Sequence, residues 1–192
     1  MVELKRIYWS RQALRLAYLA GTVWLFASAV GALMTTKAIT IAGPGPSPAT
    51  TILREIFDRV LATVAVPGMF LVLLTVIAVV IRSGDVRRRD PVRRFSRQQR
   101  REGMARAAGL CEMEAGFRGR CSRPDEHGDH FYPWSKGGST SLKNFVAACA
   151  RCNRTKGARI PSPGQQGRME QRRRDYVTPD GSVSVGERQP LR

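Results

Sequence analysis

The chain has 192 residues, a length that accommodates one or two domains. Its formal net charge is +17, and most basic residues follow position 81, whereas most apolar residues precede it. This division argues against one evenly mixed soluble domain and indicates a negatively charged partner, either nucleic acid or an anionic membrane surface.

The first 81 residues contain two stretches without a charged residue, 16–36 and 60–81. Each has about the ~20 residues that a helix needs to cross a bilayer. We therefore predict a two-helix transmembrane hairpin over residues 1–81, with Pro67 as a tolerated break in the second helix. A cleaved signal peptide, with Ala27-Ser28-Ala29 as its small-residue site, is the alternative for the first stretch.

The segment between the two spans, 37–59, carries fewer basic residues than the flanks outside them. The positive-inside rule then places both termini in the cytoplasm, with membrane lipid as a partner and the bacterial inner membrane as the location. The motif AGPGPSP at 42–48 indicates an extended connection, and 51–59 is expected to form a short helix capped by Thr51. Ala17-xxx-Gly21 and Ala27-xxx-Gly31 have the small-residue spacing that packs membrane helices.

An arginine-rich segment, 82–106, follows the second span and is interpreted as a basic cytoplasmic linker. Such a run suits a flank that lies on anionic lipid headgroups. It also suits an arm that contacts nucleic-acid phosphates, and the two uses are compatible.

All four cysteines fall within one short stretch of the chain, at Cys111, Cys121, Cys149 and Cys152. In a reducing cytosol, clustered cysteines bind metal more often than they form disulfides. Together they have the composition of a closed, tetrahedral, structural Zn²⁺ site. A zinc ion would stabilise a segment too short to bury a sizeable core.

The pattern around the second cysteine pair predicts a ββα unit. We expect a first strand at 129–133, a glycine-containing turn, a returning strand at 142–146 and a short helix at 150–158. His127 is expected on the loop before the first strand. The fold class is therefore α+β, with the membrane hairpin followed by a small zinc-stapled domain at 107–160 and a basic tail at 161–192. A basic helix is expected in that tail at about 167–175.

The residues of this unit resemble an HNH endonuclease, in an H-N-N form with Asn at the third signature position. The matching positions are Asp129-His130, Pro133, Ser135, Gly137-Gly138, Asn144, Cys149-x-x-Cys152-Asn153 and Lys156. The resemblance covers about residues 111–160 and implies a ββα fold that holds one divalent ion.

The resemblance also implies roles for individual side chains. His130 is expected to take a proton from water, while Asp129 and Asn153 ligate a catalytic Mg²⁺ or Mn²⁺. Asn144 is expected to hold the loop between the strands and to orient His130. Taken singly, Asn144 also suits a simple turn and Asn153 a helix cap.

Basic residues around this unit are expected to contact DNA phosphates: Lys136, Arg151, Arg154 and Lys156. We therefore expect a membrane-anchored, metal-dependent endonuclease that hydrolyses DNA. The alternative is a non-catalytic, membrane-tethered zinc module that binds nucleic acid or a protein. The sequence leaves the oligomeric state open.

Overall fold

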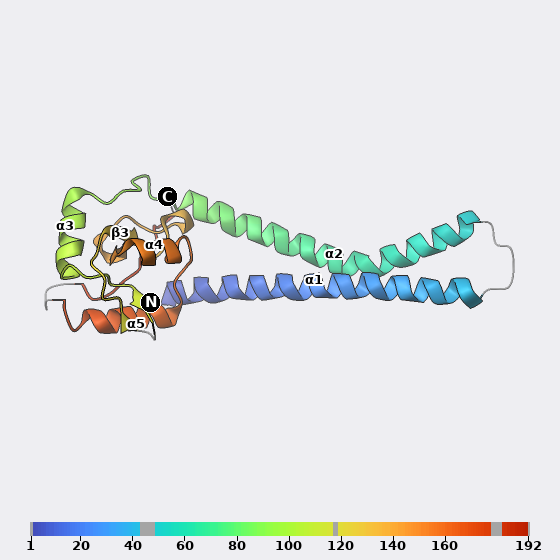
Figure 1. Ribbon diagram of the computed structural model, residues 1–192. Coiled ribbons are helices and arrows are strands. Elements are labelled where there is room, and N and C mark those ends of the chain that lie inside the picture. The colour runs from blue at the N-terminus through green and yellow to red at the C-terminus, as the bar shows by residue number, and fades with distance from the viewer. Residues whose placement is uncertain (1, 43–48, 117–118, 178–181, 192) are drawn as a thin grey trace. The chain divides into compact units, whose positions relative to one another are not determined.

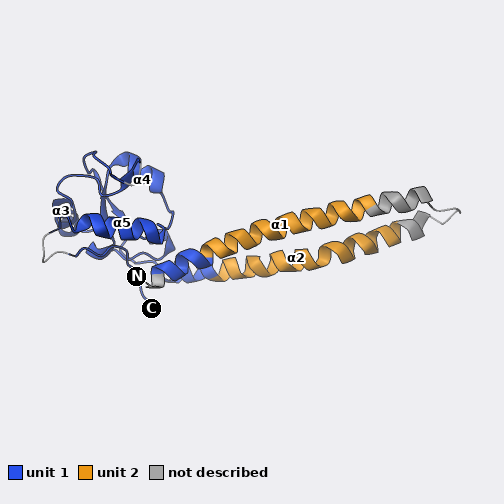
Figure 2. Cartoon of the chain, turned by 90° about the horizontal axis from the view of Figure 1, so that it is seen from below, with its two compact units in different colours: residues 1–10, 81–192 blue, residues 11–80 orange. Residues whose placement is uncertain are grey.

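The computed structural model describes residues 2–42, 49–116, 119–177 and 182–191, with side chains described outside 2–3, 35–42 and 49–52. The chain divides into two compact units, one formed by 1–10 together with 81–192 and the other by 11–80 (Figure 2). Two helices, α1 (Val2–Ala42) and α2 (Ala49–Arg87), account for the second unit and extend into the first (Figure 1).

Within residues 11–80, α1 and α2 pack side by side (Figures 1 and 2). The hydroxyls of Tyr18 and Thr75 share a hydrogen bond of 2.7 Å between the helices. A Cβ at Gly21 would lie 2.8 Å from a Leu71 methyl, so a small residue is needed there, as the spacing of Ala17 and Gly21 predicts. A Cβ at Gly31 would meet nothing within 4 Å of the described residues, so close packing does not require a glycine there.

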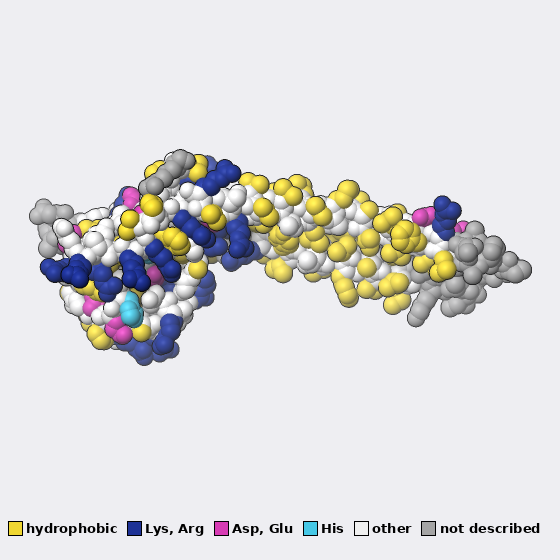
Figure 3. Space-filling model, turned by 90° about the horizontal axis from the view of Figure 1, so that it is seen from above, with side chains coloured by type: hydrophobic (Ala, Val, Ile, Leu, Met, Phe, Trp, Pro, Cys, Tyr) yellow, Lys and Arg dark blue, Asp and Glu magenta, His cyan; other side chains and the backbone are white. Residues whose placement is uncertain are grey.

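Both helices are long and apolar enough to cross a membrane, over Leu4–Met34 and Leu53–Arg87. Only 11% of the most apolar window of each is buried, unlike the core helix of a soluble protein, and hydrophobic side chains cover the surface (Figure 3). The short helix expected at 51–59 is the start of α2, so Thr51 lies inside the helix and does not cap it. α2 bends along its length in Figure 1 and contains Pro67, which removes one helix hydrogen bond. Residues 43–48, most of the expected extended connection, lie outside the described residues.

The other unit is built around two antiparallel strands, β3 (His127–His130) and β4 (Phe145–Ala148), followed by α4 (Ala150–Lys156). Alternate residues of a strand face opposite sides, and here both sides of β4 are buried. Val146 and Ala148 join a core with the cysteines, Met169 and Val185. Phe145 and Ala147 join a second core with Phe95 and Ala107.

Phe145 is enclosed between two glycines. A Cβ at Gly128, in β3, would lie 2.3 Å from the Phe145 ring, and so would a Cβ at Gly103. Gly103 belongs to α3 (Arg97–Arg106), a helix that begins with a capping box formed by Ser96 and Gln99. The segment expected as a linker at 82–106 therefore contains a helix that packs on the sheet.

The ladder between β3 and β4 is shorter than the sequence predicts. The first strand is 127–130, so His127 lies on the strand and pairs with Ala148, not on the preceding loop. Residues 142–144 form a 3₁₀ turn instead of a strand. The reason is Asn144, whose side chain binds both the N–H and the C=O of Tyr132 and so replaces the next rung of the ladder.

The C-terminal segment, expected as a basic tail, is folded against the same sheet. Its helix α5 (Pro163–Arg173) begins four residues earlier than predicted, because Ser162 caps it and Pro163 fits the first turn. Arg173 is fully buried and forms a two-bond ion pair with the buried Glu112, at 2.9 and 3.0 Å. The tail then returns to the sheet, and Ser139 donates its N–H to the Glu187 carbonyl.

Candidate active site

The four cysteines meet at one point. Their sulfur atoms all lie within 4.8 Å of one another, and a tetrahedral zinc with bonds of about 2.3 Å separates its sulfurs by about 3.8 Å. A hairpin of β1 (Glu114–Ala115) and β2 (Gly119–Arg120) lies between Cys111 and Cys121. This hairpin explains the nine-residue interval, because the antiparallel pairing of its two strands brings Cys121 back beside Cys111.

Burial and hydrogen bonding shift the pKa values of the thiols in this cluster, and not all in the same direction. Burial raises the pKa of Cys111 to about 11, and burial also raises the pKa of Cys152. Burial acts in the same direction on Cys149, but hydrogen bonds from Cys152 outweigh it and lower the pKa of Cys149. A bound cation would favour the deprotonated form of all four thiols, since a thiol that coordinates a metal releases its proton to solvent. The residues therefore fit a thiolate-bound metal ion.

His130 lies at the end of β3, on the side of the sheet that Phe145 occupies. Its ring packs on the Phe95 ring, with centroids 4.3 Å apart and an interplanar angle of 31°. Its Nε2 lies 3.1 Å from the Thr140 hydroxyl oxygen. Burial lowers the pKa of His130 to about 4, against the effect of the Asp129 carboxylate and together with that of the Lys156 ammonium. The imidazole is therefore neutral at neutral pH, which is the form that accepts a proton.

Asp129 occupies the preceding position and faces α4. Its Oδ2 forms an ion pair with the Lys156 ammonium at 2.8 Å. The same ammonium donates a hydrogen bond to the His130 carbonyl at 2.6 Å. Asn153 lies three residues before Lys156, and residues at this spacing share one face of a helix. The structure therefore brings Asp129 and the Asn153 face of α4 together.

Cys149, and not Asn153, is the N-cap of α4, and its sulfur accepts the N–H of Cys152 at 3.5 Å. Asn153 thus lies inside the helix, and a capping role for it is wrong. In the described residues no side-chain donor contacts the Asp129 Oδ1 atom, and none contacts the Asn153 carboxamide oxygen. Two oxygen donors, one a carboxylate and one a carboxamide, are the kind that Mg²⁺ and Mn²⁺ prefer.

Asn144 is fully buried, and among the described hydrogen bonds none joins its side chain to the His130 ring. Its amide donates to the carbonyls of Tyr132 and Ser139 at 3.0 and 2.7 Å. Its oxygen accepts the N–H groups of Tyr132 and Glu187 at 2.8 and 3.3 Å. Asn144 therefore joins the loop after β3 to the C-terminal segment.

The four expected phosphate-binding residues differ in exposure. Arg151 and Arg154 are exposed on α4, and Lys136 is half-buried. The Lys156 side chain is only 10% exposed, because its ammonium is committed to Asp129 and the His130 carbonyl. Lysine and arginine side chains gather over the surface of this unit, as Figure 3 shows.

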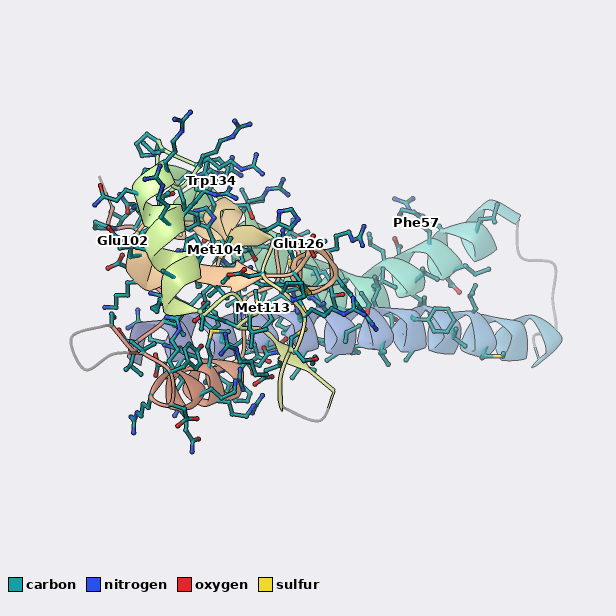
Figure 4. The ribbon with its side chains drawn as sticks, turned by 60° about the vertical axis from the view of Figure 1, so that its left-hand side comes forward. Phe57, Glu102, Met104, Met113, Glu126 and Trp134 are labelled. Carbon is teal, nitrogen blue, oxygen red and sulfur yellow. The ribbon has the colours of Figure 1, made fainter. Side chains whose placement is uncertain are left out.

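Sequence analysis missed the segment that enters the site from the end of α2. Trp134, labelled in Figure 4, donates its ring N–H to the Asp90 carbonyl at 2.8 Å. The guanidinium groups of Arg89 and Arg93 lie 5.2 and 5.3 Å from the Trp134 ring centroid. The local signal for this segment is the Asp90-Pro91 pair, because Asp-Pro favours a turn. The surrounding run of arginines made the pair look like part of a linker.

A family model described as HNH endonuclease matches residues 118–159. No match was found among the curated proteins or among the solved structures. The matched segment contains β3, β4 and α4, and with them Asp129, His130 and Asn153. The expected architecture is confirmed: two apolar helices precede a small ββα region with four clustered cysteines. This chain therefore carries an HNH endonuclease domain at residues 118–159.

Proposed function

We propose that this chain is a membrane-anchored endonuclease that hydrolyses phosphodiester bonds of DNA with the help of a divalent metal ion. HNH nucleases act on DNA and use such an ion, and the chain carries their domain. The observation that carries the proposal is the pairing of His130 and Asp129 at the end of β3. One is a neutral, partly covered imidazole, and the other is a carboxylate directed at α4.

His130 is the general base in this proposal. A neutral imidazole takes a proton from water, and the water oxygen then attacks phosphorus as the bond to the leaving oxygen breaks. The adjacent strand positions direct His130 and Asp129 to opposite sides of the sheet. Base and ion-binding carboxylate are thereby separated.

Asp129 and Asn153 are the residues that would hold the catalytic Mg²⁺ or Mn²⁺. When bound, such an ion supplies positive charge against the negative charge that develops on the phosphate and the leaving oxygen. Lys156 holds Asp129 in place through its 2.8 Å contact and carries positive charge beside the site. We assign it to the site itself, and assign the phosphate contacts to Lys136, Arg151 and Arg154.

The second metal in this proposal is a structural Zn²⁺ held by Cys111, Cys121, Cys149 and Cys152. Cys149 and Cys152 bracket the start of α4, the helix that carries Asn153. Zinc would therefore tie the start of α4 to the two ends of the β1–β2 hairpin and fix the position of the helix that carries Asn153.

The two apolar helices are assigned as the membrane anchor. They form a hairpin, so its two ends lie on one side of a bilayer, and residues 1–10 belong to the same compact unit as 81–192. We assign that side to the cytoplasm because both ends carry basic residues, as the positive-inside rule expects. The bacterial inner membrane is the proposed location.

The test is nicking of supercoiled plasmid by the full chain in detergent micelles, with Mg²⁺ or Mn²⁺ and with zinc content measured in parallel. His130→Ala should lower the cleavage rate by about 10²–10⁴-fold, as expected for one acid–base group. His127→Ala is the matched control, since His127 lies on the same strand with a side chain that is 49% exposed. Cleavage by His130→Ala at the wild-type rate would overturn the proposal and favour the tethered, non-catalytic zinc module.

The dependence of the cleavage rate on metal concentration tests whether Asp129 and Asn153 hold the catalytic ion. Asp129→Ala and Asn153→Ala should lose activity that part-recovers at higher Mg²⁺ or Mn²⁺. Asn153→His should be milder than Asn153→Ala, because His fills this position in the commoner form of the motif. A loss that no concentration of either metal alters would remove these two residues from the ion site.

A further inference from the structure

Residues 90–95, which we name the clamp segment, follow α2 and lie against the ring of His130. Phe95 is 8% exposed, and its ring covers one face of the imidazole at 4.3 Å between centroids. Phe95 is itself held edge-on against Phe145, at 4.9 Å and 71°. Phe145 pairs with His130 across the two strands. The clamp segment thus covers one face of the imidazole and restrains its movement.

Thr140 joins the clamp segment to the nitrogen of the imidazole. Its hydroxyl donates to the carbonyl of Val92, and its oxygen lies 3.1 Å from His130 Nε2. A carbonyl only accepts, and a hydroxyl has a single hydrogen to donate, so the Thr140 hydrogen is committed to Val92. Thr140 must then accept from His130. Nε2 therefore carries the hydrogen, and in the neutral ring the lone pair is on Nδ1.

Asp90 fixes both of the groups on which this arrangement depends. One of its carboxylate oxygens accepts the N–H of Thr140 at 2.9 Å, and the other accepts the N–H of Val92 at 2.9 Å. Its carbonyl accepts the ring N–H of Trp134 at 2.8 Å. The carboxylate thereby sets the distance between the Thr140 hydroxyl and the Val92 carbonyl.

We propose that Thr140 is a positioning residue for His130, held in place by Asp90 and Val92 of the clamp segment. The inference rests on the proposed function, in which His130 is the base. Thr140 orients the imidazole and selects the tautomer with hydrogen on Nε2, which makes Nδ1 the atom that accepts the proton of the attacking water. The O–H bond of water breaks, the proton moves to Nδ1, and the electron pair stays on the oxygen that attacks phosphorus. The matched family segment begins at residue 118, so the clamp segment is supplied from outside it.

The test uses three variants of the full chain in detergent micelles. Thr140→Val keeps the shape of the side chain but removes the hydroxyl, and Thr140→Ser keeps the hydroxyl. Thr155→Val is the matched control, because Thr155 is an exposed residue of α4. Asp90→Asn provides a second route to the same effect, since one carboxamide oxygen cannot accept both the Thr140 and Val92 N–H groups in the observed geometry.

Two readouts are taken for each variant. The first is kcat and KM for plasmid nicking, and the second is the ring ¹⁵N spectrum of labelled histidine, which distinguishes the two tautomers. The chain has only two histidines, so His127→Gln assigns the signals. Thr140→Val should lower kcat by about 10- to 100-fold with KM within about 2-fold, and should mix the tautomers. Thr140→Ser should restore both, and Thr155→Val should change neither.

The two readouts keep this inference distinguishable from the proposed function. If the wild-type chain does not cut DNA, the proposed function fails, and the tautomer spectrum alone decides whether Thr140 orients His130. If the wild type cuts and Thr140→Val leaves either the rate or the tautomer unchanged, the positioning role is overturned. Zinc content equal to that of the wild type shows that a variant has folded; if Thr140→Val does not fold, Asp90→Asn is judged by the same two readouts.

Discussion

At the residue scale, the side chain of Asn144 is fully buried and tightly held. All of its polar capacity is used on four backbone groups, two of them on Tyr132. The resemblance to HNH endonucleases implied that Asn144 holds the loop and helps to orient His130. Its contacts support the first role directly. The second stays a proposal, since the described hydrogen bond and ring contact of the imidazole are made by Thr140 and Phe95.

Asn144→Asp should destabilise the domain although the two side chains have nearly the same shape. A carboxylate cannot donate to the carbonyls of Tyr132 and Ser139, and it carries a buried charge without a cationic partner. Each buried group left unsatisfied costs about 1–3 kcal/mol, so we expect a loss of about 2–5 kcal/mol. Chemical denaturation measures the free energy of unfolding. Gln171→Glu, the same exchange at an exposed site on α5, should change it little, and an equal loss in both variants would contradict this account of Asn144.

At the scale of elements, the contact of α3 with the sheet depends on the absence of a side chain at Gly103. Alanine normally stabilises a helix relative to glycine by about 0.5–1 kcal/mol. Here a Cβ would lie 2.3 Å from the ring of Phe145, a residue already enclosed by Gly128.

Gly103→Ala should therefore reverse the usual sign and destabilise the domain by about 1–3 kcal/mol, the typical cost of overpacking. Gly167→Ala is the control, because Gly167 lies in α5 with nothing within 4 Å of an added Cβ, and it should be neutral or stabilising. Thermal unfolding of both variants measures the difference. A stabilised Gly103→Ala would show that α3 does not pack as described.

The second element-scale contact joins the β1–β2 hairpin to α5. The Glu114 carboxylate forms ion pairs with Arg168 at 2.7 Å and with Arg172 at 3.3 Å. Burial acts to raise the pKa of Glu114, but hydrogen bonds from the two arginines outweigh it and hold the pKa below its usual value. The folded state then binds fewer protons at this site than the unfolded state.

The stabilisation that the ionised Glu114 side chain contributes is therefore fully present above its unfolded-state pKa of about 4.3. It is lost as the pH falls through the lower folded-state pKa. We expect Glu114→Gln to be less stable than the wild type at pH 7 and to approach it as the pH falls below about 4. Unfolding curves for the two proteins across this range provide the measurement. A difference independent of pH would show that the ion pairs contribute nothing.

At the scale of the whole molecule, the clamp segment determines where the domain begins. A fragment that starts at residue 81 keeps Asp90 and Phe95, whereas one that starts at residue 101 loses both and shortens α3. Burial of a Phe side chain contributes about 1.5–3 kcal/mol, and its loss uncovers Phe145 and His130. We expect the longer fragment to retain zinc and nicking activity, and the shorter one to unfold at lower temperature and cut more slowly. Equal melting temperatures and rates would show that the clamp segment is dispensable.

Topology is the second prediction at this scale. Both ends of the hairpin carry more basic residues than the segment between its spans. A reporter that is active only outside the cytoplasm should stay silent when fused after Arg192 and should be active when inserted between the two spans. The opposite pattern would reverse the orientation and reopen disulfide formation for the four cysteines.

The sequence by itself determined the parts of this protein that depend on local pattern. Uncharged runs of membrane length predicted the two helices, and the order of Asp129, His130, Asn144 and the cysteines indicated the ββα domain. Short-range signals were informative because helix length, ligand type and turn residues act within a few neighbouring positions. The same reasoning placed the helix of the C-terminal segment only approximately, since Ser162 and Pro163 were not read as its start.

Only the tertiary structure decided which distant residues complete the site. Asp90 lies 50 positions from Thr140, and Phe95 lies 35 positions from His130. Helix and strand periodicity relate residues only a few positions apart, so they do not predict these two contacts. Likewise, only the structure shows that Gly103 and Gly128 both pack against the ring of Phe145, which leaves no room for a Cβ at either position. Such contacts arise from the packing of α3 and the clamp segment onto the sheet. A charge-rich sequence conceals that packing, because its few buried residues are scattered among many exposed arginines.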